Sequence, residues 1–210
     1  MEELDISSTS VITDDYGVDN LSSLNQLCLY DLEESYLPSD EWLPPTVQTL
    51  EVCLSKSLKS LSLHQNVSSL EKLMINDCLK LTSVAGVQNL HSLKELIITN
   101  CPELHLSPNE YLPSSLHSLE VTGCESLRSI PLHQNLSSLE KLNINGCLNL
   151  TSVVGIQNLN SLKELVIKHC PELHLSPNEY PSSLQSLEVN GCERFPSTAS
   201  EPILSQEAKS

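Results

Sequence analysis

The sequence predicts a solenoid of the α/β class, in which short repeats stack around a parallel β-sheet of about nine short strands. Aromatic residues make up only 3% of the chain, so its core must be built from aliphatic side chains, chiefly Leu. The pattern L-x-x-L-x-[LIV]-x-x also recurs every 23 residues, with one final step of 22. Its nine copies start at Met1, Leu24, Val47, Leu70, Leu93, Leu116, Leu139, Leu162 and Leu184.

A longer period lies on top of this repeat. Residues 78–100 match residues 147–169 at 16 of 23 positions. The segment CPELHLSPNEYLPSSLHSLEVTGC at 101–124 returns at 170–192 as CPELHLSPNEYPSSLQSLEVNGC. Three units therefore form a 69-residue super-repeat, and we expect one repeat domain over residues 1–192. Because Met1 aligns with the first position of a strand motif, we expect this domain to be N-terminally truncated; residues 193–210 lose the period and are expected to form a polar, disordered tail.

The L-x-L centre of each unit predicts a short strand. In one copy, Leu142 and Ile144 would point inward while Asn143 and Asn145 would point outward. A single strand cannot bury its apolar side alone, so neighbouring units must stack into a parallel sheet. The stretches between strands, such as CLNLTSVVGIQN, contain Gly and β-branched residues and little helical periodicity. We expect these outer segments to be mostly irregular or 3-10.

Cysteines occupy the position just after the strand in six units. They are Cys78, Cys101, Cys124, Cys147, Cys170 and Cys192. Stacking would bring consecutive ones to about 5 Å, but parallel side chains neither converge on a tetrahedral metal nor face each other as a disulfide requires. We interpret them as a structural cysteine ladder of buried thiols, with a metal site or disulfides as the alternatives. Cys28 and Cys53 fall on outward strand positions, where we expect exposed thiols.

The charge is strongly acidic and unevenly distributed. The chain has a net charge of −16, and residues 1–55 carry twelve Asp or Glu and no Lys, Arg or His. Such a surface disfavours nucleic acid and anionic membranes and favours a basic protein partner, although an acidic face can also serve solubility alone. The N-terminus lacks a basic, apolar leader, which predicts an intracellular chain, whereas four N-x-[ST] sequons argue weakly for secretion.

The sequence shows no catalytic constellation and predicts that the chain is not an enzyme. His105 and His174 occupy one repeat position, as do His64 and His133, so duplication explains their presence. The chain contains no G-x-x-x-x-G-K-[ST], G-x-G-x-x-G or G-x-S-x-G motif. We therefore expect neither a cofactor nor a catalytic metal.

The outward strand positions form the candidate protein-binding surface, which we expect on a concave face of the sheet. Among them, Met74, Ile97 and Val166 stand where a solvated strand favours polar residues, which indicates either a contact patch or drift in a duplicated sequence. The candidate residues are Asp5, Tyr30, Glu51, Met74, Asn76, Ile97, Thr99, Glu120, Thr122, Asn143, Asn145, Val166, Lys168, Glu188 and Asn190.

The repeat pattern resembles leucine-rich repeats over residues 1 to about 192. The 23-residue unit, the Cys after the strand, and phrases such as SLEKLNINGCLNLTSV and LPSSLHSLEVTGCESL resemble the C-terminal repeats of plant intracellular nucleotide-binding leucine-rich-repeat (NB-LRR) disease-resistance proteins. The resemblance implies a horseshoe that recognises a pathogen effector or a host protein. It also implies contact with the receptor's own nucleotide-binding module and a cytoplasmic or nucleocytoplasmic location.

Three other interpretations of the function stay open. The substrate-recruiting domain of a ubiquitin-ligase adaptor also uses Cys-containing leucine-rich repeats, but its units are longer, carry an outer helix and follow a helical adaptor motif. A free-standing repeat protein would bind a partner without a receptor around it. A secreted receptor fragment would predict L-x-G-x-I-P phrases, which this sequence lacks.

Overall fold

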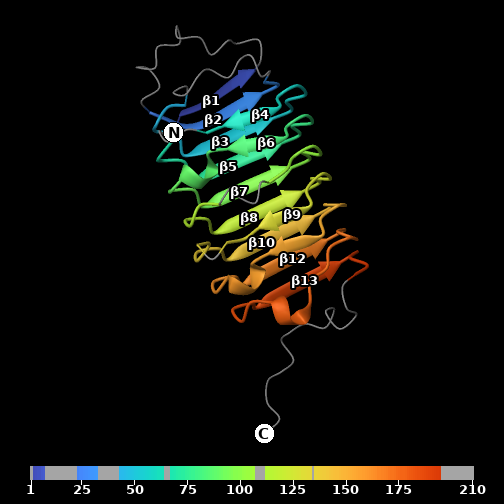
Figure 1. The fold of residues 1–210 in the computed structure, drawn as a ribbon. Coiled ribbons are helices and arrows are strands. Elements are labelled where there is room, and N and C mark those ends of the chain that lie inside the picture. Colours follow the sequence, from blue (N-terminus) through green and yellow to red (C-terminus); the bar gives the residue numbers. More distant parts are fainter. Residues whose placement is uncertain are drawn as a thin grey trace.

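The computed structural model confirms a parallel-strand solenoid (Figure 1). It describes residues 2–7, 23–32, 43–63, 67–106, 112–133 and 135–194, so most of the predicted tail at 193–210 lies outside the described residues. Nine parallel strands form one sheet in chain order. They are β1 (Glu2–Ser7), β2 (Leu24–Tyr30), β3 (Thr49–Cys53), β5 (Lys72–Asn76), β7 (Glu95–Thr99), β8 (Ser118–Thr122), β10 (Lys141–Asn145), β12 (Glu164–Lys168) and β13 (Ser186–Asn190).

The register follows the repeat length. From β3 onward, each strand residue pairs with the residue one unit later, as Leu50 does with Leu73 and Leu73 with Leu96. The deletion between Tyr180 and Pro181 is absorbed before β13, because Leu165 still pairs with Leu187. One register therefore runs through the sheet from Glu3 of β1 onward, and equivalent residues of successive units form straight columns across it.

The outer side contains more regular structure than the sequence predicted. Three 3-10 turns match the expectation: η3 (Val87–Asn89), η4 (Ile156–Asn158) and η5 (Pro177–Glu179). Two additional two-stranded parallel sheets were not expected. They pair β4 (Ser60–Ser62) with β6 (Ser83–Ala85), and β9 (Ser129–Pro131) with β11 (Ser152–Val154). The central residue of each outer strand is a buried aliphatic, so the stacking that aligns the inner strands aligns these segments too.

Two glycines make the close packing of the outer side possible. Gly86 and Gly155 have φ of 88° and 89° and begin the 3-10 turns η3 and η4. A Cβ atom added at these positions would lie 1.7 Å from the carbonyl oxygen of Leu63 and 1.9 Å from that of Leu132. Both the backbone conformation and the approach of the preceding unit therefore require Gly.

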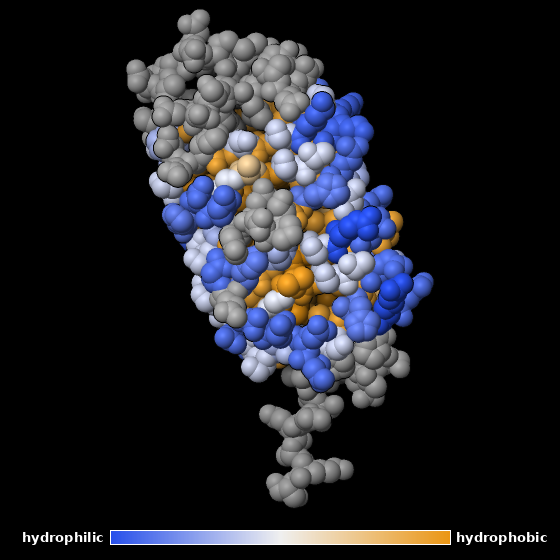
Figure 2. All heavy atoms as spheres, viewed as in Figure 1, coloured by the Kyte–Doolittle hydropathy of each residue, from blue (hydrophilic) through white to orange (hydrophobic). Residues whose placement is uncertain are grey.

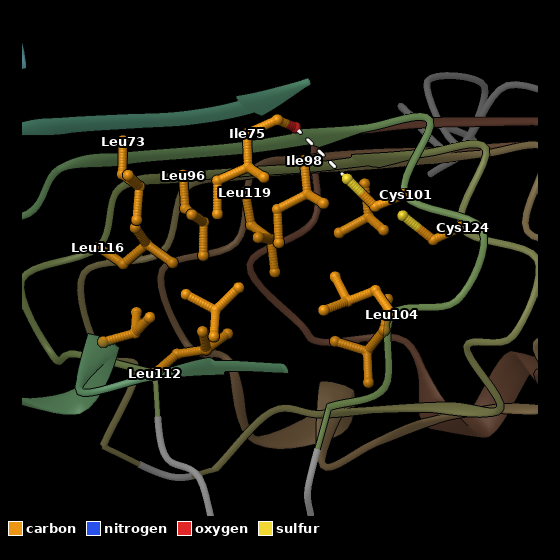
Figure 3. Packing of buried hydrophobic residues seen from close by; sticks show 14 of the residues in the cluster. Leu73, Ile75, Leu96, Ile98, Cys101, Leu104, Leu112, Leu116, Leu119 and Cys124 are labelled. Atoms are coloured by element: carbon orange, nitrogen blue, oxygen red, sulfur yellow. Dashed lines mark hydrogen bonds between the residues drawn. The ribbon is translucent and has the colours of Figure 1, made fainter. Parts of the chain in front are cut away.

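An aliphatic core fills the space between the two sides. In β5, Leu73 and Ile75 are fully buried while the residues that alternate with them are half-buried, and β8 and β12 repeat this pattern. Figure 3 shows how Leu73, Leu96 and Leu119 lie in one column beside Ile75 and Ile98. Each leucine thus packs on its equivalents in the adjacent units, which gives a continuous core.

The six ladder cysteines lie in a column at the carboxyl ends of the strands, where Figure 3 shows the sulfurs of Cys101 and Cys124 side by side. All are free thiols, and five are buried; Cys192 is half-buried behind the last strand. Each Sγ donates to the carbonyl oxygen two residues earlier, at 3.2 Å for Cys170 and 3.7 Å for Cys124. Ser55 holds the same position near the N-terminal end, and its hydroxyl accepts from the Leu32 amide at 2.9 Å.

A column of left-handed residues precedes the ladder. These residues turn the chain out of each strand. Except for Gly191 after the last strand, their amides donate to the last carbonyl of the next strand, as Gly123 does to Asn145 at 2.8 Å. They are Asp31, Leu54, Asp77, Asn100, Gly123, Gly146, His169 and Gly191, with φ between 50° and 65°. Leu54 differs from the other residues of this column because its side chain is bulky and apolar. It therefore carries the full cost of a positive φ, and its side chain makes no local hydrogen bond that would offset this cost.

Exposed ion pairs cross between units at the start of the strands. Glu71 accepts from Lys94 at 2.8 Å, while the next residue, Lys72, pairs with Glu95 at 2.9 Å. The same crossed arrangement returns 69 residues later as Glu140–Lys163 and Lys141–Glu164. Each pair contributes at most about 1 kcal/mol, because all the side chains are solvent-exposed. A shifted register would bring like charges together, so the pairs favour one alignment.

The thiol column leads to a prediction about reactivity. In the native protein we expect Ellman's reagent to modify about one thiol per chain quickly, since seven of the eight cysteines are buried and Cys192 alone is half-exposed. Burial raises the pKa of the Cys124 thiol to about 11 and so suppresses its reactive thiolate. Cys192→Ser should remove the fast phase, and denaturant without reductant should release all the thiols. Several fast thiols in the native state, or a shortfall in denaturant, would contradict this arrangement.

The left-handed column leads to a paired stability test. Leu54→Asn should raise the free energy of unfolding by up to about 1 kcal/mol, because Asn tolerates a positive φ and the leucine side chain is 53% exposed. Gly146→Ala should lower it by about 1 kcal/mol for the opposite reason. A Cβ at residue 146 has no neighbour closer than 3.7 Å, so the cost there is conformational. Urea unfolding measures both, and equal effects of the same sign would refute the conformational explanation.

Candidate binding surface

The face of the nine-stranded sheet that points away from the core is the candidate functional surface, and we call it the solvent face. It consists of the strand residues that alternate with the buried aliphatics. The pleat places these residues on the side opposite the core, in three columns that cross the strands. The middle column reads Asp5, Cys28, Glu51, Met74, Ile97, Glu120, Asn143, Val166 and Glu188.

The structure places all fifteen predicted site residues on this face and brings them into register. Met74, for example, pairs with Glu51 on one side and Ile97 on the other. Most are half-buried; Asp5, Glu188 and Asn190, at the two ends of the sheet, are exposed. Their role in binding stays a prediction.

Sequence reasoning missed the first column of the face. Here Lys72, Glu95, Lys141 and Glu164 lie at the start of their strands, two residues before the middle column, and belong to the crossed ion pairs. The available signal was the alternation itself, because the position two residues before an outward residue must also point outward. The order of charges also indicates this column, because Glu-Lys at the start of one strand is followed by Lys-Glu at the same place in the next unit.

The expected exposure of Cys28 and Cys53 was wrong. Both lie on the solvent face, but only 2% and 5% of their surfaces are exposed. Small side chains on a sheet are covered by larger ones beside them: Cys28 lies between Gln26, whose amide is 3.7 Å from its sulfur, and Glu51, which accepts from the thiol at 3.9 Å. Burial, followed by the charge of Glu51, raises the pKa of the Cys53 thiol to about 12. These thiols are therefore poorly reactive.

Charged groups on the solvent face fall into two classes. Each of its three lysines pairs with a glutamate on the next strand: Lys72 and Lys141 in the first column, and Lys168, which contacts Glu188 at 2.8 Å. Among the solvent-face residues whose side chains the structure describes, three carboxylates remain without a cation: Asp5, Glu51 and Glu120. Glu51 accepts a hydrogen bond from the Asn76 amide at 3.2 Å. Glu120 has neither a hydrogen-bond nor an ion-pair partner among the described residues.

Apolar surface is also accessible away from the sheet. Figure 2, drawn from the same side as Figure 1, shows hydrophilic residues along both long edges of the molecule and hydrophobic residues between them. The most exposed large apolar side chain is that of Val154 on β11, at 57%. Leu54, Leu79 and Leu148 follow. These four residues lie outside the nine-stranded sheet, whereas Met74 and Ile97 are direct neighbours on the solvent face.

The described residues show neither a metal centre nor a membrane span. No group of three or more His, Cys, Asp or Glu could hold a metal ion in that part of the chain. None of its helices is long and apolar enough to cross a bilayer.

Comparison with known proteins agrees with this geometry. The family model for the BspA-type leucine-rich repeat region matches residues 51–174 with six copies. Among solved structures, the leucine-rich repeat domain of the type III effector XopL is 22% identical over 89% of this chain and 76% of that one, with a TM-score of 0.60. InlP of Listeria monocytogenes is 21% identical with a TM-score of 0.63 over 90% of this chain. This chain spans 56% of the InlP chain. At these identities the likeness concerns the fold. No curated protein matches the sequence.

The match covers more than half of the chain and includes the strands from β5 to β12 and five of the six ladder cysteines. The chain therefore belongs to the family of BspA-type leucine-rich repeat proteins.

Proposed function

We propose that the chain is a protein-recognition module that binds its partner on the solvent face of the nine-stranded sheet and catalyses no reaction. The observation that carries this proposal is the continuous array of half-buried polar and apolar side chains held in one register across the sheet. Repeat proteins of this family generally mediate protein–protein interaction, and extended solenoid surfaces suit that role. A rigid sheet presents its side chains without an ordering cost at binding, which favours affinity.

Two valines on consecutive strands that belong to different sheets provide a matched test. Val166 lies half-buried on the solvent face of β12, and Val154 lies exposed on the outer strand β11. Val166→Arg should abolish capture of the cellular partner, because it places a long cation in the middle column of the proposed binding face. Val154→Arg makes the same chemical change elsewhere and should leave capture intact. Quantitative affinity capture from the source cells compares both variants with the parent protein, and unchanged capture with Val166→Arg would refute the proposed interface.

In its narrower form, the proposal makes this chain the C-terminal sensing and autoinhibitory part of a plant intracellular NB-LRR receptor in defence, located in the cytoplasm or shared with the nucleus. Its support is the resemblance of SLEKLNINGCLNLTSV and LPSSLHSLEVTGCESL to the repeats of those receptors. The ligand would then be a pathogen effector or a host protein, and the nucleotide-binding module would be an intramolecular partner. The family match supports leucine-rich repeats in general and adds nothing specific to this narrower form.

The native transcript tests the narrower form directly. We expect the reading frame to continue upstream of Met1 into further repeats and a phosphate-binding loop. A start codon at Met1 would leave a free-standing binding module, and an upstream helical adaptor motif would point to ubiquitin-ligase recruitment instead.

A further inference from the structure

The charge balance of the solvent face points to one chemical class of partner, and this inference rests on the proposed binding function. All three lysines of the described face are neutralised by glutamates of the adjacent strand. The unneutralised carboxylates that remain are Asp5, Glu51 and Glu120. The face is therefore net negative at fixed positions, and its surplus lies in the middle column.

Glu51 and Glu120 bracket an apolar pair. Glu51 on β3 is in register with Met74 on β5, Met74 with Ile97 on β7, and Ile97 with Glu120 on β8. At about 4.8 Å per strand, the backbone positions of the two glutamates lie about 14 Å apart. Met74 and Ile97 are half-buried, so their side chains already present accessible apolar surface between the two charges. The resulting pattern across four strands is anion, apolar, apolar, anion.

We infer that this part of the solvent face binds an extended basic segment of a partner protein that crosses the strands. In an extended chain, alternate residues share a face and residues i and i+4 are about 13 Å apart. Two cationic residues at i and i+4 would reach Glu51 and Glu120, and an apolar residue at i+2 would pack on Met74 and Ile97. An α-helix fits less well, because residues that share its face at this range are i and i+11, about 16 Å apart.

The neighbouring side chains suit such a segment. Asn76 already donates to Oε1 of Glu51 and fixes its orientation, so the carboxylate is preorganised for a cation. Thr99 and Thr122 pair across the strands two residues after Ile97 and Glu120, and they offer hydroxyl groups to a cationic side chain. Glu120, which has no polar partner among the described residues, would gain one on binding.

Peptide titration tests the inference on the whole chain. The probe is a synthetic peptide containing KSLSK, and isothermal titration calorimetry at low salt measures its Kd. A peptide with the same composition rearranged to KKLSS should bind at least about threefold more weakly, because its cations cannot reach both carboxylates. An alanine-rich helical peptide with lysines at i and i+11 tests whether the face binds a helix instead of an extended segment.

Charge-matched variants separate site binding from general attraction. Glu51→Gln and Glu120→Gln should each weaken binding of the KSLSK peptide by about threefold, the scale of one partly screened ion pair. Glu125→Gln removes the same charge from an exposed residue outside the sheet and should leave the Kd unchanged. Circular dichroism and the thiol count confirm that the variants are folded.

Each other outcome overturns the inference. If Glu125→Gln weakens peptide binding as much as Glu51→Gln does, the effect is due to net charge alone. Equal Kd values for the KKLSS and KSLSK peptides would reject the proposed spacing of the two cations. Tighter binding of the helical peptide would show that the face binds a helix and not an extended segment. If no peptide binds while Val166→Arg still abolishes partner capture, the proposed function stands and this inference fails. If Val166→Arg leaves capture unchanged, the proposed function itself fails.

Discussion

The structure depends on in-register stacking of a unit of nearly constant length. A strand of five residues with two inward aliphatics cannot fold alone, and it becomes stable only when the units on both sides complete its hydrogen bonds and cover its core residues. The constant 23-residue length makes every column straight: leucines stack on leucines, thiols on thiols and left-handed residues on left-handed residues. Between β5 and β7 and between β10 and β12, the crossed ion pairs also penalise a shift of one unit against the next.

The same constraint explains what the sequence could predict. Strand position, register and inward residues followed from the spacing of Leu alone, because those positions are fixed by burial. Cys28 and Cys53 were misjudged because exposure depends on the size of the neighbouring side chains and not on the face alone: Cys28 is covered by Gln26 of its own strand and by Glu51 of the next unit. The outer strands β4, β6, β9 and β11 escaped prediction because each has only three residues, too few to show a period.

The charges of the solvent face were visible in the sequence, but their balance was not. A count of the charged residues gives a large acidic excess, but it does not show which carboxylates are neutralised by a cation. Only the structure shows that Lys168 on β12 is paired with Glu188 on β13, while Glu120 on β8 has no cation beside it. A binding site made of columns is therefore partly predictable, because its members can be named while their pairing requires the structure.

The internal duplication separates positions that hold the fold from positions free to change. Between β5–β7 and β10–β12, the inward residues of each strand are identical, as are the ladder cysteines that follow. The ion-paired first column is also identical. Differences between these strands fall on the other two columns of the solvent face, where Met74 corresponds to Asn143, Ile97 to Val166 and Thr99 to Lys168. Core positions tolerate little change because each packs against both neighbouring units. Residues that face solvent carry no such penalty, so the two copies keep one architecture while presenting different surfaces to a partner.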